Sequence, residues 1–175
     1  MRIRKASLLH VVLDVETTGL NAARGDRIIE IGAVVVQNGA IIDEFHSFVK
    51  PPKQISKSAQ LVHGITDAML IGQPTPEEVF PQFYDFIKNS VLVAHNAKFD
   101  IGFLRIEFPR HRLSLNHRYI CTLEMSRQHF PRLSNHKLGT VYRHLVGKST
   151  ADIQAHRALG DAHMVAAIWL AMEGK

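Results

Sequence analysis

Apolar and β-branched side chains dominate three stretches in the first third of the chain, a composition typical of β-strands. These stretches are 10–16, 27–37 and 40–49. The last two are separated by Asn38-Gly39, a dipeptide typical of two-residue hairpin turns. The pattern therefore predicts three consecutive strands, of which the second and third form a hairpin.

The rest of the chain shows helical patterns around short apolar runs. The sequence T-P-E-E at 75–78 is a typical helix start, with Thr as the N-cap and Pro in the first helical position. Further elements are predicted as follows: short helices at 58–62 and after Thr66, a helix from the T-P-E-E start to about Asn89, a buried strand at 91–94, a helix at 99–108, an edge strand at 118–122, and helices at 123–129, 137–145 and 158–172. This order predicts an α/β protein whose mixed five-stranded sheet, an antiparallel meander plus parallel strands, is flanked by helices.

Length and composition limit the class of protein. With 175 residues, 46% of them apolar, the chain can build a core unaided, so we expect a single domain over 1–175. No run of about 18 uncharged apolar residues occurs, which predicts no membrane span. Asp14 and Glu16 interrupt the first apolar stretch and argue against a signal peptide. Cys121 is the single cysteine, which excludes an internal disulfide and suits a cytoplasmic location.

The net charge of +5 is concentrated in one part of the chain. Nine Lys and Arg residues but two acids lie between Arg105 and Lys148. A cationic surface of this kind attracts phosphate backbones, and Arg132, Lys137 and Arg143 are the candidates for a basic patch. The alternative is a solvated basic face without a ligand.

Two acids on one strand form the first candidate site. Asp14 and Glu16 are two residues apart, so both carboxylates project from the same face of the predicted strand. Like charges this close repel, and hard divalent cations such as Mg²⁺ or Mn²⁺ would offset that repulsion. The alternative is a solvent-facing pair on an exposed strand.

Three more polar residues follow at the ends of predicted elements. Asp100 begins a helix directly after the strand 91–94, at the carboxyl end where α/β proteins place ligand sites, although an acid in a first helical turn also favours the helix dipole. His156 and Asp161 would lie about 140° apart within one helix. We therefore expect His156 on a loop before the helix and Asp161 in its first turns, with a structural histidine as the alternative.

Taken in order, these motifs resemble a known family. D-V-E-T-T-G at 14–19, H-N-A-K-F-D at 95–100 and H-x-x-x-x-D at 156–161 resemble the three motifs of the DEDDh 3′–5′ exonucleases, in particular the proofreading epsilon subunit type of bacterial DNA polymerase III. The segments 27–33 and 62–67 are also similar. The resemblance implies a ribonuclease-H-like fold and release of nucleoside 5′-monophosphates from the 3′ end of DNA, in proofreading or 3′-end trimming.

The resemblance also implies roles for individual residues. Two Mg²⁺ or Mn²⁺ ions would be held by Asp14, Glu16, Asp100 and Asp161, and His156 would take the proton of the attacking water. Imidazole suits that task near neutral pH. Paired ions about 3.5–4 Å apart form the clamp expected for in-line displacement at phosphorus.

Contacts to the terminal nucleotide follow from the resemblance as well. The expected residues are Thr17, Thr18, Leu20, His63, Asn96 and Phe99. Each has a structural alternative. Leu20 would cap the core from a loop, and His63 would bond to a turn. Asn96 would cap the following helix, and Phe99 would pack in the core with Phe103.

Two functional questions stay open at this point. The same five residues occur in exoribonucleases of the family, since selection against RNA depends on 2′-hydroxyl contacts that no motif reveals. A non-catalytic nucleic-acid-binding scaffold is the alternative from another class. The expected partners are single-stranded or frayed 3′ ends of DNA, with RNA possible, and a replicative polymerase.

Overall fold

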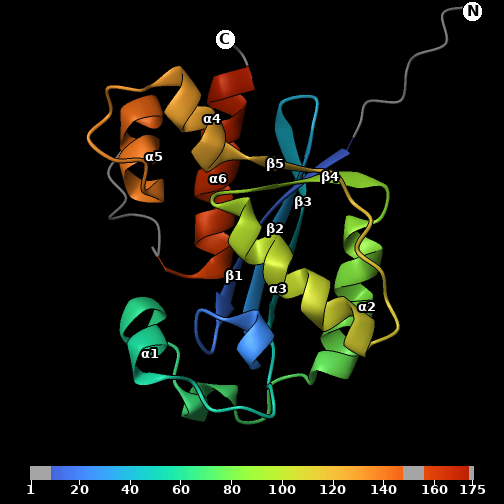
Figure 1. The fold of residues 1–175 in the computed structure, drawn as a ribbon. Helices are drawn as coiled ribbons and strands as arrows, with labels where there is room; N and C mark the ends of the chain where they lie inside the picture. Colours follow the sequence, from blue (N-terminus) through green and yellow to red (C-terminus); the bar gives the residue numbers. More distant parts are fainter. Residues whose placement is uncertain (1–8, 148–155, 174–175) are drawn as a thin grey trace, which may run out of the picture.

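The computed structural model describes residues 9–147 and 156–173 and contains a mixed five-stranded sheet (Figure 1). The strand order is β3-β2-β1-β4-β5. The strands are β1 (Leu9–Thr17), β2 (Ile28–Gln37), β3 (Ala40–Phe48), β4 (Ser90–Ala94) and β5 (Tyr119–Cys121). The first three pair antiparallel, whereas β4 runs parallel to β1 and to β5. The predicted sheet is thereby confirmed.

The turn between β2 and β3 sets the register of these two strands. Asn38 and Gly39 both have positive φ, 52° and 80°, which a two-residue hairpin of this kind requires. Across the neighbouring pair, Asp14 of β1 lies opposite Gly32 of β2, and Glu16 lies opposite Glu30. One face of the sheet therefore carries the acids Asp14, Glu16 and Glu30, and the neighbouring Gly32 has no side chain.

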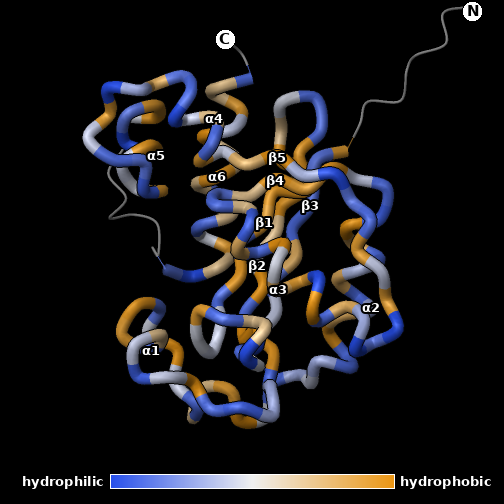
Figure 2. The backbone as a smooth tube through the Cα atoms, viewed as in Figure 1, coloured by the Kyte–Doolittle hydropathy of each residue, from blue (hydrophilic) through white to orange (hydrophobic). Residues whose placement is uncertain are grey.

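Helices cover both faces of the sheet. They are α1 (Lys57–His63), α2 (Pro76–Ile87), α3 (Ala97–Arg110), α4 (Thr122–His129), α5 (Leu138–Val146) and α6 (Ala158–Glu173), with 3₁₀ turns η1 (Ala22–Arg24) and η2 (Asp67–Leu70). Figure 1 shows α2 and α3 on one side of the strands and α6 on the other. The buried side chains agree: Leu13 packs with α2 and α3, whereas Val12 packs with Trp169 of α6. In Figure 2 the central strands are mostly orange, and blue segments lie in the outer loops.

The helix α3 differs from its prediction. It begins at Ala97 rather than Phe99 and continues past Pro109. Its buried residues include two acids, Asp100 and Glu107, which apolar periodicity cannot assign to a buried face. Glu107 is buried against Arg27 at the start of β2, in a two-pronged ion pair whose Nη2–Oε2 distance is 2.9 Å.

The segment after Thr66 is also corrected, because it forms a 3₁₀ turn rather than an α-helix. The Thr66 side chain accepts a hydrogen bond from the amide of Met69, as an N-cap does. Within the described ranges 9–147 and 156–173, no helix has the length and apolar character needed to cross a bilayer.

Candidate active site

Three carboxylates from the two ends of the chain meet at one point. Asp14 and Glu16 project from β1, and Asp161 projects from the first turn of α6. One carboxylate oxygen of each lies within 4.8 Å of the others. The Oδ1 atom of Asp161 is buried and has no hydrogen-bond partner in the described part of the protein. Such an oxygen is costly unless a cation binds it.

The approach of α6 to the sheet depends on Gly32. A Cβ atom at this position would lie 2.1 Å from the amide nitrogen of Leu159 and 2.2 Å from the carbonyl carbon of Ala158. Only a glycine lets the start of α6 lie directly on β2. Because Asp14 is the register partner of Gly32, this contact brings Asp161 over the two carboxylates of β1.

Asp100 lies close to the same group but is already bonded. Its side chain is 2% exposed, and its Oδ1 accepts a hydrogen bond from the amide of Val15 at 3.2 Å. Val15 lies between Asp14 and Glu16 in β1. Asp100 is outside the cluster of three oxygens, and its bond to the backbone of β1 keeps it next to Asp14 and Glu16 in the fold.

The electrostatics of the cluster favour a cation. Burial raises the pKa of Asp14 well above its ordinary value, and the charges of Asp100 and Asp161 raise it further. Burial and the charge of Asp161 raise the pKa of Glu16 to about 8. Burial raises the pKa of Asp100 to about 8 and that of Asp161 to about 6. Hard carboxylate oxygens that repel one another this strongly fit one or more divalent ions.

His156 lies beside the carboxylates on the loop before α6, as predicted. It is exposed, and its backbone is in the left-handed region with φ of 62°. The amide of Asp161 donates to the carbonyl of Arg157 at 3.0 Å, so the helix is formed one residue after His156. An imidazole in this position is open to a substrate phosphate and to water.

The loop after β1 is held firmly by its own contacts. The amide of Thr18 donates to the carbonyl of Arg27 at 2.8 Å, and the carbonyl of Thr18 accepts from Ser56 at 2.9 Å. His63 is buried, and its Nδ1 accepts from Ile65, so the proton is on Nε2, which lies 3.2 Å from the carbonyl of Thr17. The expected bond of His63 to backbone is therefore present.

The remaining expected substrate contacts differ in exposure. Leu20 is 85% exposed, so it does not cap the core. Asn96 is exposed and stands before α3, but its backbone is left-handed and its side chain makes no capping bond. Phe99 is half-buried, with its ring 4.9 Å from that of Phe103. Leu20 and Asn96 are thus accessible to a ligand, whereas the ring of Phe99 packs partly against the core.

Comparison with known proteins identifies the family. The family model described as Exonuclease matches residues 11–169. The chain belongs to this exonuclease family. The DNA polymerase III subunit epsilon of Pasteurella multocida is 40% identical over 173 residues, covering 94% of this chain and 68% of that subunit. The PolC-type DNA polymerase III of Bacillus cereus is 44% identical over 153 residues, or 87% of this chain. The chain spans about a tenth of the length of such PolC-type relatives.

Solved structures agree with this membership. A structure of exonuclease X in complex with 5′ overhanging duplex DNA has a TM-score of 0.74 at 31% identity, covering 94% of this chain and 91% of that one. The nuclease domain of 3′hExo, a DEDDh family member bound to rAMP, has a TM-score of 0.79 at 22% identity, covering 97% and 94%. The second likeness concerns the fold alone. The expected ribonuclease-H-like fold is confirmed, and the cluster of three carboxylates agrees with the divalent ions that exonucleases of this family generally use.

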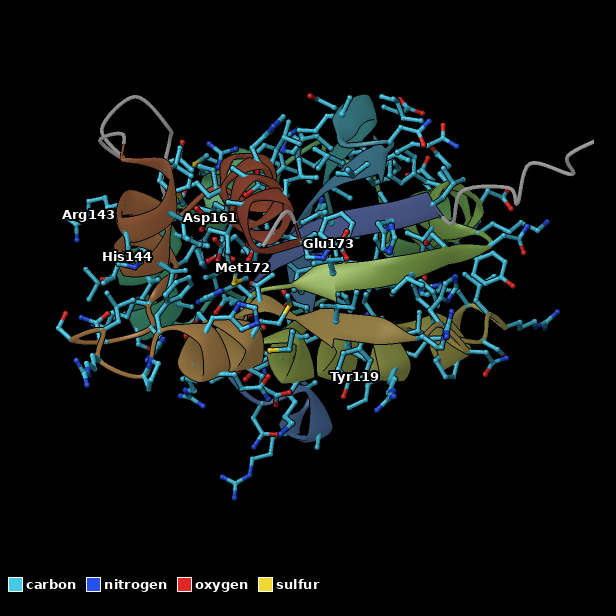
Figure 3. All side chains as sticks on the ribbon, turned by 90° about the horizontal axis from the view of Figure 1, so that it is seen from above. Tyr119, Arg143, His144, Asp161, Met172 and Glu173 are labelled. Atoms are coloured by element: carbon cyan, nitrogen blue, oxygen red, sulfur yellow. The ribbon has the colours of Figure 1, made fainter. Side chains whose placement is uncertain are left out.

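A basic groove adjoins the exonuclease site. It is an open cavity of about 290 Å³ that contains Asp161 and His156 on one side and Lys137 and Arg143 on the other. Figure 3 shows α5, which carries Arg143, next to the start of α6 at Asp161. Arg132 lines a different cavity with Phe130 and His144, so two of the three expected basic residues adjoin the site.

Lys137 connects this groove to a second one. A cavity of about 490 Å³ is lined by His95, Asn96, Leu123, Arg127, Asn135, His136 and Lys137. His95 is fixed there, with Nε2 2.8 Å from the carbonyl of His136 and Nδ1 2.9 Å from the hydroxyl of Thr122. The two cavities share Lys137, so together they extend from Asp161 to His95.

One pair of residues beside the site is not predicted by the sequence patterns. Glu30 is fully buried on β2, and the guanidinium of Arg157 binds it, with Nη2 2.8 Å from Oε1. Glu30 is an acid within an otherwise apolar strand, which is itself a signal of an obligatory partner. Its partner is 127 residues away in the sequence and is therefore not visible from local patterns.

Proposed function

We propose that the protein is a metal-dependent 3′–5′ exonuclease that removes nucleoside 5′-monophosphates from single-stranded or frayed 3′ ends of DNA. The observation that carries this proposal is the cluster of Asp14, Glu16 and Asp161, which opens beside His156 onto a groove with two cations. Acids alone would repel a polyanion, so an acidic site at the end of a basic groove suits a phosphodiester that is held by metal ions.

In this proposal Asp14, Glu16 and Asp161 would hold Mg²⁺ or Mn²⁺, and the buried Asp100 would complete the site directly or through water. Two bound ions supply the positive charge that lowers the pKa of water and stabilises the leaving oxygen. His156 accepts the proton of the attacking water, a contribution of about 10²–10⁴-fold to the rate. The exposed Leu20 contacts the terminal base, and His63 keeps the carbonyl of Thr17 in place beneath the terminal nucleotide.

The choice of DNA follows from the relatives. The epsilon and PolC-type relatives are DNA polymerase III proteins, and the exonuclease X structure contains duplex DNA. We infer proofreading or 3′-end trimming as the role, with a replicative polymerase as the partner. We further propose that residues 1–175 act as one exonuclease domain in the cytoplasm, where the free, buried Cys121 would stay reduced.

Digestion of matched, 5′-labelled single-stranded DNA and RNA with Mn²⁺ under single-turnover conditions tests the proposal. We expect a ladder that shortens from the 3′ end of DNA, with nucleoside 5′-monophosphates as products. Blocking the 3′ hydroxyl should stop the reaction, whereas blocking the 5′ end should not. Asp14→Ala and Asp161→Ala should each abolish hydrolysis while the protein still folds.

Other outcomes separate the remaining functions. Faster shortening of RNA than of DNA would make the protein an exoribonuclease. Cleavage of circular single-stranded DNA would show endonuclease activity. Binding of DNA or RNA without release of nucleotides at any Mn²⁺ concentration would indicate a non-catalytic scaffold instead of an exonuclease.

A further inference from the structure

We propose that Glu30 is a positioning residue for this reaction. Through Arg157 and the amide of Ala158, Glu30 holds the peptide that carries His156, and it thereby sets where the imidazole stands relative to the three carboxylates. The inference rests on the role of His156 in the proposed function. It assigns a task to a buried acid that neither binds the ions nor contacts the substrate.

The contacts of Glu30 converge on the loop before α6. The guanidinium of Arg157 approaches both oxygens, with Nε at 3.2 Å from each and Nη2 at 2.8 Å from Oε1. The amide of Ala158 donates to Oε2 at 3.3 Å. From the other side, Nε2 of His46 on β3 lies 2.7 Å from Oε1. Two consecutive residues after His156 are therefore fixed to one carboxylate.

The hydrogen bonding of Glu30 separates it from the acids of the cluster. Its oxygens contact Nε2 of His46, the guanidinium of Arg157 and the amide of Ala158. Oδ1 of Asp161, in contrast, has no partner in the part of the chain that the structure describes. Among the described residues, Glu30 is also outside the cluster of metal-binding oxygens. Its lone pairs are used by protein donors, as expected for an anchor rather than a metal ligand.

His156 needs such an anchor. A left-handed backbone is unfavourable for a residue with a Cβ, and it persists only where the surroundings enforce it. The side chain of Arg157 is held at two points, by Glu30 and by the ring of Phe48, whose centroid lies 5.1 Å from the guanidinium carbon. The carbonyl of Arg157 meanwhile begins α6 by accepting from Asp161. The residue that follows His156 is thus bonded to Glu30 on β2 and to α6, the helix that carries Asp161.

The competing explanation is that the ion pair of Glu30 and Arg157 only stabilises the fold. A double-mutant cycle distinguishes this explanation from the positioning of His156. Glu30→Gln keeps the shape of the side chain but removes its charge. Glu107→Gln is the matched control, because Glu107 is equally buried and paired with Arg27, away from His156. The rate of single-turnover hydrolysis at saturating Mn²⁺ and the Tm are measured for wild type, Glu30→Gln, Glu107→Gln, His156→Ala and the Glu30→Gln/His156→Ala double variant.

We expect Glu30→Gln to lower the rate by about 10²-fold in the wild-type background, as a misplacement of a reacting group by about 1 Å does. In the His156→Ala background the same change should cost less than about threefold, because coupled residues are not additive. Glu107→Gln should lower the Tm and leave the rate within about threefold of wild type. If Glu30→Gln does not fold, Arg157→Gln replaces it in the same cycle, because the side chain of Arg157 is 29% exposed. The same loss of rate is expected for Arg157→Gln.

Four results would overturn the inference. Equal rate losses in both backgrounds would show that Glu30 acts on the fold as a whole. Recovery of the Glu30→Gln rate by raising Mn²⁺ would show that it acts on metal affinity. A wild-type rate in Glu30→Gln, together with a low rate in His156→Ala, would exclude the positioning role of Glu30 and leave the proposed function intact. A wild-type rate in His156→Ala would instead overturn the base assignment, and the inference with it.

Discussion

Repulsion among acids is the dominant property of the residues at the site. Asp14, Glu16 and Asp161 face one another at the end of β1, and the buried Asp100 accepts a hydrogen bond from Val15, between Asp14 and Glu16. Each has a raised pKa, so without a cation the folded protein keeps protons that the unfolded chain releases. The site is therefore expected to destabilise the metal-free fold at neutral and alkaline pH.

The first prediction concerns the pH dependence of stability without metal. The pKa of Asp161 is about 6 and that of Glu16 about 8 in the folded protein, against values near 4 in the unfolded chain. Because the folded state binds more protons between pH 4 and 8, the free energy of unfolding falls as the pH rises through this interval. In EDTA we expect the Tm to be about 10 °C lower at pH 8 than at pH 5.5, on a scale of about 2–4 °C per kcal/mol.

Asp14→Asn provides the control for this prediction. Removing one of the repelling charges should raise the Tm of the metal-free protein at pH 8 and have little effect at pH 5.5. Added Mn²⁺ should stabilise wild type at pH 8 far more than it stabilises the variant. Parallel Tm–pH curves for the two proteins in EDTA would mean that other groups cause the pH dependence.

Among the elements, the contact between α6 and β2 decides whether the site forms. Gly32→Ala would push a methyl group into the backbone of Ala158 and Leu159, neither of which can move without shifting α6. We expect a loss of at least about 1–3 kcal/mol in stability and a large loss of hydrolysis, since Asp161 moves with the helix. Thermal unfolding and single-turnover rates measure the two effects.

Gly102→Ala is the matched substitution for that experiment. Gly102 lies within α3, and an added Cβ there meets no atom within 4 Å. An alanine should stabilise the helix by about 0.5–1 kcal/mol and leave hydrolysis unchanged. Similar behaviour of Gly32→Ala and Gly102→Ala would contradict the close packing of α6 on the sheet.

Local patterns were sufficient for most elements and for part of the site. The hairpin at Asn38 and the start of α2 at Thr75 follow from turn and cap chemistry, which acts within a few residues. The common face of Asp14 and Glu16 follows from the strand period. The buried face of α3 was not predicted, because Glu107 is buried by a partner, Arg27, that is distant in sequence.

The meeting of Asp161 with the acids of β1 could be expected only from family resemblance. No periodicity in the sequence relates α6 to β1, and the helix is apolar nearly all round. The physical cause is the missing side chain at Gly32, whose meaning appears only when the neighbouring helix is in place. Long-range contacts of this kind, including Glu30 with Arg157, are the part that sequence patterns cannot supply.

For the molecule as a whole, charge separates into an acidic site and a basic groove. Neutralising Lys137 and Arg143 together should remove about two phosphate contacts, each worth about −0.7 in the slope of log affinity against log salt for a single strand. Anisotropy titrations of single-stranded DNA at several salt concentrations, in an Asp14→Asn background, should therefore give a flatter slope for Lys137→Gln/Arg143→Gln.

Arg132→Gln is the comparison for the groove. Its side chain lines another cavity, with Pro131 and Leu133, so its removal should leave the slope unchanged although the net charge also falls. Equal flattening by Arg132→Gln would point to diffuse attraction by the whole basic surface. No flattening in the double variant would remove Lys137 and Arg143 from the path of the strand.

The packing of α6 on β1 also gives the protein a natural optical reporter. Trp169 is the one tryptophan of the chain, and its buried ring lies 4.4 Å from that of His10 on β1. Its emission therefore changes when α6 docks, which is the same event that carries Asp161 to Asp14. Because these acids come from opposite ends of the sequence, a partly folded chain has no complete group of carboxylates. Intrinsic fluorescence thus follows, in real time and without a label, the moment at which a refolding chain assembles Asp14, Glu16 and Asp161 into one site.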